Sequence, residues 1–171
     1  MIQNADSKFF AFRMSDIVLV ICEVSDHFIH SIDADCGKMI FECALFQNII
    51  EDMILYRDAS DQKIMDFYTE LGEILCDRDF RILYLETENI AGNLGVIRKE
   101  RSDDKGNELW FPLMLEYFDN SPYAVKRGLS GEQELINHFT HRQELELRIC
   151  REIFPDKVTV LRSKNYTDKD L

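Results

Sequence analysis

Short apolar runs alternate with longer amphipathic stretches in this chain, and this alternation restricts the fold more than any other feature. Three runs have the length and composition of buried strands, "KMIFEC" at 38–43, "RILYLE" at 81–86 and "KVTVLRS" at 157–163. The stretches between them are long enough for crossover helices, which parallel strands require. The pattern therefore predicts an α/β fold with a parallel sheet covered by helices on both faces.

Helical spacing of apolar residues marks most of the remaining chain. A helix predicted over about 60–76 should bury Leu71, Ile74 and Leu75 along one stripe. Asn, Ser, Pro and Gly in "DNSPYAVKRGLSG" predict a loop over 119–131. Helices are predicted over 44–58, about 60–76, 89–101, 109–118 and 132–153.

The stretch from 17 to 32 fits two structures. It can be a strand over 17–24, or a helix capped by Ser15 whose apolar face continues through Phe28 and Ile32. The helix is favoured because a strand leaves the two later residues unexplained, although the β-branched content points to the strand.

Composition narrows the classes of function. With 32 acidic and 20 basic residues the formal charge is -12, which disfavours binding to nucleic acid or to anionic membranes. Five widely spaced cysteines, without a CxxC pair or a signal peptide, indicate reduced thiols in a cytoplasmic protein. No apolar stretch has the roughly 20 residues of a membrane span. One domain over 1–171 is expected.

Glu42 stands at the carboxyl end of the first predicted strand. Ligands of parallel α/β sheets bind beyond such strand ends, and a carboxylate there can hold a magnesium ion through water. An ordinary solvated glutamate, favoured by the dipole of the following helix, fits the same position.

Two clusters of cations could contact phosphate. In "VIRKER", Arg98, Lys99 and Arg101 lie at the end of a predicted helix, where they could serve a lid over about 93–107 or merely offset the helix dipole.

The second cluster lies in the predicted loop, where Tyr123, Lys126 and Arg127 combine an aromatic face with two charges. A solvated basic loop explains them equally well. The two histidine pairs, 27/30 and 138/141, lack further ligands in a zinc pattern, so no zinc site is expected.

Four parts of the sequence stand out together and in this order: "IFECALFQN", then "ILYLETENI" with "IRKER", then "YAVKRGLSGEQELINHF" with "RQELELRI", and finally "VLRSKNYTD". With these segments the chain resembles a family of bacterial P-loop kinase-like proteins, ATP-binding proteins related in fold to nucleotide and nucleoside kinases. The resemblance runs from about Phe10 to Tyr166.

The resemblance implies roles for individual residues. Glu42 would take the magnesium-water role beside Mg-ATP, and Arg98 and Arg101 would reach the phosphates from the lid. Gln47 and Asn48 would face a nucleoside- or nucleotide-like acceptor. The resemblance also implies a three-layer α/β/α fold.

One hallmark of such proteins is missing, because the sequence contains no GxxxxGK[ST] phosphate loop. The chain is therefore expected to be a carboxyl-terminal portion or a degenerate member, without its first strand, and to bind Mg-ATP no more tightly than about millimolar. Two hypotheses follow: a phosphotransferase, incomplete in this chain, or a non-catalytic module that binds a protein partner. A sheet edge left without its neighbour could pair with a second copy of the chain.

Overall fold

A pair of parallel strands, β1 (Ile82–Glu86) and β2 (Val158–Arg162), forms the sheet of the described structure. The computed structural model describes residues 45–163, all within one of the two units of the chain, residues 42–171. Ile82 lies opposite Val158 and Glu86 opposite Arg162, so both strands end at the same edge, as predicted. The strand predicted at 38–43 and the helix predicted at 17–32 lie outside the described residues.

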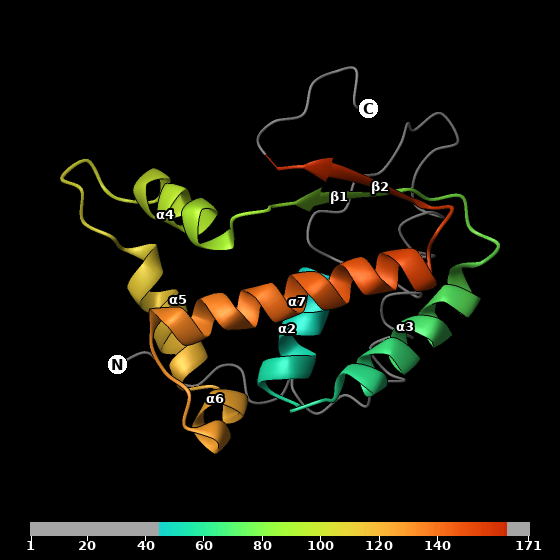
Figure 1. Ribbon diagram of the computed structural model, residues 1–171, viewed down its shortest axis with the longest axis horizontal. Helices are drawn as coiled ribbons and strands as arrows, with labels where there is room; N and C mark the ends of the chain where they lie inside the picture. The colour runs from blue at the N-terminus through green and yellow to red at the C-terminus, as the bar shows by residue number, and fades with distance from the viewer. Residues whose placement is uncertain (1–44, 164–171) are drawn as a thin grey trace, which may run out of the picture. The chain divides into compact units, whose positions relative to one another are not determined.

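Helices make up most of the described chain. Together with the parallel strand pair they give it a mixed α/β fold. None of those within 45–163 is both long and apolar enough to cross a bilayer. The helices predicted within the described residues are confirmed, with ends that differ by a few residues. They are α2 (Gln47–Leu55), α3 (Asp61–Leu75), α4 (Ile90–Glu100), α5 (Trp110–Asp119) and α7 (Glu132–Glu152) (Figure 1). One further helix, α6 (Pro122–Arg127), was not predicted.

The helix α6 corrects the prediction of a continuous loop over 119–131. The Ser121 hydroxyl accepts a hydrogen bond from the backbone N–H of Ala124, and Pro122 occupies the first turn. Gly128 closes the helix with φ 65°. These residues are turn formers, but in this order they are also the start and stop signals of a short helix.

The core lies around α7, which runs along the strand pair and contacts α3, α4 and α5 (Figure 1). Side chains from four elements are fully buried there, namely Ile50, Met53, Ile64, Tyr68, Phe118, Leu135 and Ile149. Burial of this apolar area supplies most of the favourable free energy of folding.

Two predictions of burial are wrong. Ile74 is 48% exposed because it lies in the last turn of α3, where Leu75 is also only partly covered. In β1, Ile82 and Tyr84 are buried, whereas Leu83 and Leu85 are 59% and 52% exposed. Alternate residues of a strand point to opposite faces, so the continuous apolar run concealed a strand with one buried and one exposed face.

Two glycines make a matched test of this backbone. Gly128→Ala should lower the free energy of unfolding by about 1 kcal/mol, because a Cβ is strained at positive φ. Gly95→Ala should raise it by up to about 1 kcal/mol, since Gly95 lies inside α4 and a methyl group added there meets no other atom within 4 Å. Urea unfolding of both variants checks the signs, and equal effects would contradict the assigned backbone.

Candidate functional site

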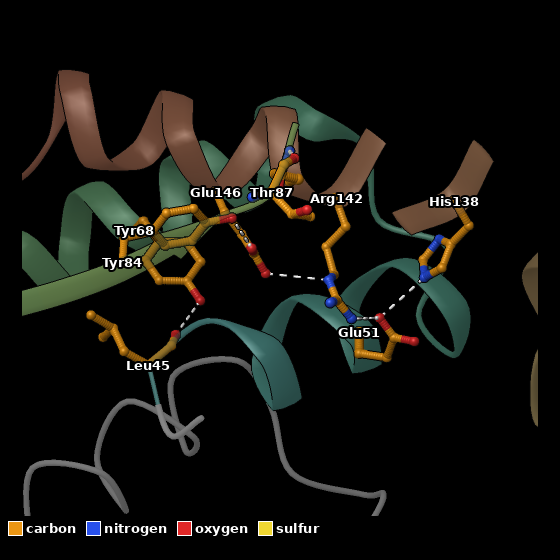
Figure 2. A network of polar contacts seen from close by, with 9 residues as sticks. Leu45, Glu51, Tyr68, Tyr84, Thr87, His138, Arg142 and Glu146 are labelled. Atoms are coloured by element: carbon orange, nitrogen blue, oxygen red, sulfur yellow. Dashed lines mark hydrogen bonds and ion pairs between the residues drawn. The ribbon is translucent and has the colours of Figure 1, made fainter. Parts of the chain in front are cut away.

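A network of polar side chains joins β1, α2 and α7 inside the protein (Figure 2). Its members share burial and at least one charged neighbour. They are Glu51, Tyr84, His138, Arg142 and Glu146.

Arg142 is the centre of the network. Its Nη1 donates to Glu51 Oε2 at 2.7 Å, and its Nε lies 3.3 Å from Glu146 Oε1. The second contact is an ion pair that is not aligned as a hydrogen bond. Burial alone would lower the pKa of Arg142, but the two carboxylates outweigh it and raise the pKa. The guanidinium is therefore a permanent buried cation.

Glu146 binds the network to the sheet. The Tyr84 hydroxyl donates to its Oε2 at 2.6 Å, and the Glu146 side chain is only 7% exposed. Burial raises the pKa of Glu146, and the opposing effects of Arg142 and Tyr84 do not cancel this. Burial and the nearby carboxylate also raise the pKa of Tyr84, so the phenol keeps its proton.

Glu51 and His138 form the other end of the network. His138 Nε2 lies 3.1 Å from Glu51 Oε2, and the His138 side chain is 1% exposed. Its Nδ1 is buried without a hydrogen-bond partner, so the Nε2–H is the ring donor that the contact with Glu51 uses. Burial would raise the pKa of Glu51, but the His138 hydrogen bond and the charge of Arg142 lower it.

A second polar contact from α7 holds the point where β1 ends. The Gln143 amide accepts from the backbone N–H of Thr87 at 3.2 Å and donates to the Thr87 carbonyl at 3.0 Å. Since α4 begins at Ile90, this pair fixes the start of the connection from the sheet to α4.

Arg98, predicted to contact phosphate, is held by carboxylates. Its guanidinium bonds to Glu108 at 2.9 Å and to Glu132 at 2.9 Å, and it stacks on Phe111 at 3.9 Å from the ring centre. The following turn is ordered by Asp103, whose carboxylate accepts from the backbone of residues 105 and 107. The predicted lid, 93–107, therefore has several anchoring contacts in this structure, and its role as a lid stays a prediction.

The cations of α6 are also paired. Lys126 lies 2.5 Å and Arg127 2.6 Å from the carboxylate of Asp58, and these two partners lower the pKa of Asp58. Arg127 stacks on Tyr123, with its guanidinium carbon 4.1 Å from the ring centre. The structure thus brings Tyr123, Lys126 and Arg127 together, but around a carboxylate of the chain itself.

The other predicted residues lie apart from these groups. Arg101 ends α4 with its guanidinium over Trp110, and no carboxylate within 45–163 forms a described ion pair with it. Gln47 and Asn48 are exposed at the start of α2. Glu42 lies outside the described residues.

Sequence reasoning missed the buried network, although α7 carried a signal for it. Arg142 lies about two turns from both Leu135 and Ile149, so a charged residue occupies the centre of the apolar stripe. Such a residue requires a buried partner of opposite charge. Among the described residues, no group of three or more His, Cys, Asp or Glu side chains is arranged to hold a metal ion.

Comparisons with protein-family models, with curated proteins and with solved structures found no match to this chain.

Removing one member of the network should be costly. Glu51→Gln should lower the free energy of unfolding at pH 7 by about 3 kcal/mol, because Arg142 loses its closest carboxylate in a buried site. The lowered pKa of Glu51 means that its stabilisation is present above the unfolded pKa and is lost as the pH falls through the folded pKa. The deficit should therefore shrink in acid.

Denaturant titrations at several pH values measure this difference. Glu70→Gln, at an exposed position of α3, is the matched control and should change stability by less than about 0.5 kcal/mol. A deficit in Glu51→Gln that stays constant from neutral to strongly acidic pH would contradict an ionised Glu51 in the folded protein.

Proposed function

We propose that the chain is a P-loop kinase-like phosphotransferase, incomplete as it stands, that acts on a small nucleoside- or nucleotide-like acceptor, with a lid over about 93–107 that includes the end of α4 and the turn after it. One observation carries this proposal. β1 and β2 end at the same edge, and the chain passes from the end of β1 into α4, whose last turn and cap carry Arg98 and Arg101 (Figure 1). Ligands of parallel α/β sheets bind at this edge.

In the proposed site the described residues supply positive charge for phosphate. Arg98 is the stronger candidate for bidentate binding, because its planar guanidinium already donates to both carboxylate oxygens of Glu108. Gln47 and Asn48, exposed at the start of α2, would contact the acceptor. Magnesium, which neutralises phosphate charge when bound, would need Glu42, and that residue lies outside the described part of the chain.

Carboxylates of the chain itself compete with the proposed ligand. Glu108 and Glu132 already satisfy Arg98, so phosphate must displace them. The sequence also lacks the GxxxxGK[ST] motif, whose backbone amides and lysine would bind the phosphates. The proposal therefore requires weak binding by this chain, no tighter than about millimolar for Mg-ATP.

Titration of the labelled chain with Mg-ATP, followed by NMR at the arginine Nε–H groups, tests the proposal. The Arg98 and Arg101 resonances should shift with a dissociation constant of about 1 mM. Glu108→Gln should tighten binding by about threefold, because it removes one competing charge close to the phosphates. Arg101→Ala should weaken it by a similar factor.

Two controls separate this site from general charge effects. Glu116→Gln removes the same charge from an exposed position of α5 and should leave the dissociation constant nearly unchanged. Arg148, paired with Glu152 on α7, should not shift. No shift at Arg98 or Arg101 at 10 mM Mg-ATP, about tenfold above the expected constant, would reject the lid role, and micromolar binding would show that the phosphate site was misplaced.

A non-catalytic module that binds a protein partner is the second candidate. It is favoured by the pairing of Arg98, Lys126 and Arg127 with carboxylates of the chain itself, which leaves little of their charge for phosphate. This candidate predicts that Mg-ATP shifts no arginine resonance, so the same titration separates the two.

A further inference from the structure

We propose that the network around Arg142 is a one-proton switch, in which Glu146 keeps a proton and its release weakens the attachment of β1 to α7. This inference does not depend on the proposed function. It concerns the buried contacts of Figure 2, none of which has a role in the proposed phosphate site.

The count of charges supplies the first argument. Glu51 and Glu146 share one guanidinium, that of Arg142, in a site where all three side chains are largely buried. With both carboxylates ionised the site carries one uncompensated negative charge. An unpaired buried charge is strongly unfavourable, and binding of one proton removes it.

Contact geometry places that proton on Glu146. Glu51 Oε2 accepts a hydrogen bond from Arg142 Nη1 at 2.7 Å and lies 3.1 Å from His138 Nε2. Both contacts favour the ionised form of Glu51. Glu146 has the longer contact to Arg142, 3.3 Å and poorly aligned, and a neutral hydroxyl as its other donor. Glu51 therefore has the stronger protein contacts for a negative charge and is the carboxylate that remains ionised.

His138 is the competing site for the proton, and its surroundings disfavour it. Protonation would place an N–H on Nδ1, which is buried without an acceptor. The rings of Phe118 and Tyr123 lie 5.6 Å and 6.3 Å from the imidazole, centre to centre. A buried donor without a partner is unfavourable, so this geometry offers no acceptor for a second N–H on the ring.

The groups facing Glu146 come from every element packed around it. They are Tyr84 of β1, Tyr68 of α3, Glu51 of α2, and His138, Arg142 and Cys150 of α7. Tyr68 donates its hydroxyl to the Leu45 carbonyl, and burial raises the pKa of the Cys150 thiol to about 11. Neither supplies a charge that would hold Glu146 ionised, in agreement with its raised pKa.

The switch acts on the sheet because Tyr84 of β1 contacts the Glu146 carboxyl group inside the protein, so opening of β1 gives this group access to water. The Tyr84 hydroxyl binds the ionised form more strongly, but burial disfavours the ionised form by more, so hydration on opening stabilises ionised Glu146 most. A folded pKa above the unfolded value gives stability that is complete below the unfolded pKa, about 4.3 for glutamate, and is lost as the pH rises through the folded pKa. Opening of β1 should therefore become easier over that window. The Thr87–Gln143 contact lies next along the chain and should loosen with it.

Carbon-13 NMR titration of the Glu146 carboxyl group tests the proposal. We expect a pKa above the ordinary value for glutamate. Tyr84→Phe should raise it further, because the hydroxyl favours the ionised form. Glu51→Gln should lower it, because Arg142 then serves Glu146 alone. Changes of the Glu146 pKa in opposite directions distinguish a shared proton from a general loosening of the structure. If Glu51→Gln fails to fold, Tyr84→Phe still tests the proposal, because it keeps the packed aromatic ring.

Amide exchange in β1 provides the functional readout. The opening equilibrium should increase by up to about tenfold per pH unit across the window, beyond the intrinsic effect of pH. Glu146→Gln should abolish this dependence, whereas Glu144→Gln, exposed on the same helix, should keep it. A Glu146 pKa at or below the ordinary value, a proton found on His138 instead, or the same pH dependence in Glu146→Gln would each overturn the proposal.

Discussion

The ion pairs of Arg142 are the interaction on which the rest of the described structure depends. The guanidinium of Arg142 lies in the middle of an apolar helix face and cannot lose its charge. The folded chain must therefore place a carboxylate beside it. Glu51 brings α2 to this face, and Glu146, bonded to Tyr84, brings β1. Apolar burial supplies most of the free energy, but it is non-directional, whereas these contacts have one geometry.

The helix α7 transmits this constraint to the rest of the protein. Along its length it binds Arg98 through Glu132, α2 through His138 and Arg142, and the end of β1 through Gln143. Segments far apart in the sequence are thus positioned by one rigid element of five to six turns. The proposed lid over about 93–107 is attached to α7 through Arg98 and Glu132, so movement of the lid would have to break this contact.

Acidic residues of this chain form ion pairs with its cationic side chains, and the composition does not reveal which residues pair. The excess of carboxylates predicts weak binding of anions in general, but Glu108, Glu132 and Asp58 act locally by occupying the very cations that a phosphate would need. Whether such pairs are obstacles to a ligand or reversible substitutes for it depends on their exposure. The partly exposed pairs of Arg98 can exchange far more easily than the buried pairs of Arg142.

By itself the sequence determined the local structure: the positions of the described helices, the two strands and their parallel direction, because apolar periodicity, capping residues and connection length are properties of neighbouring residues. It failed for α6, where turn formers also serve as helix caps, and for Leu83 and Leu85, where an apolar run does not reveal which face is covered. It also identified Arg98 and Arg127 as cations of interest without their partners. Tertiary structure alone decided those partners, and it created the Glu51–Arg142–Glu146 network, because pairing across 91 residues depends on how helices pack rather than on any local pattern.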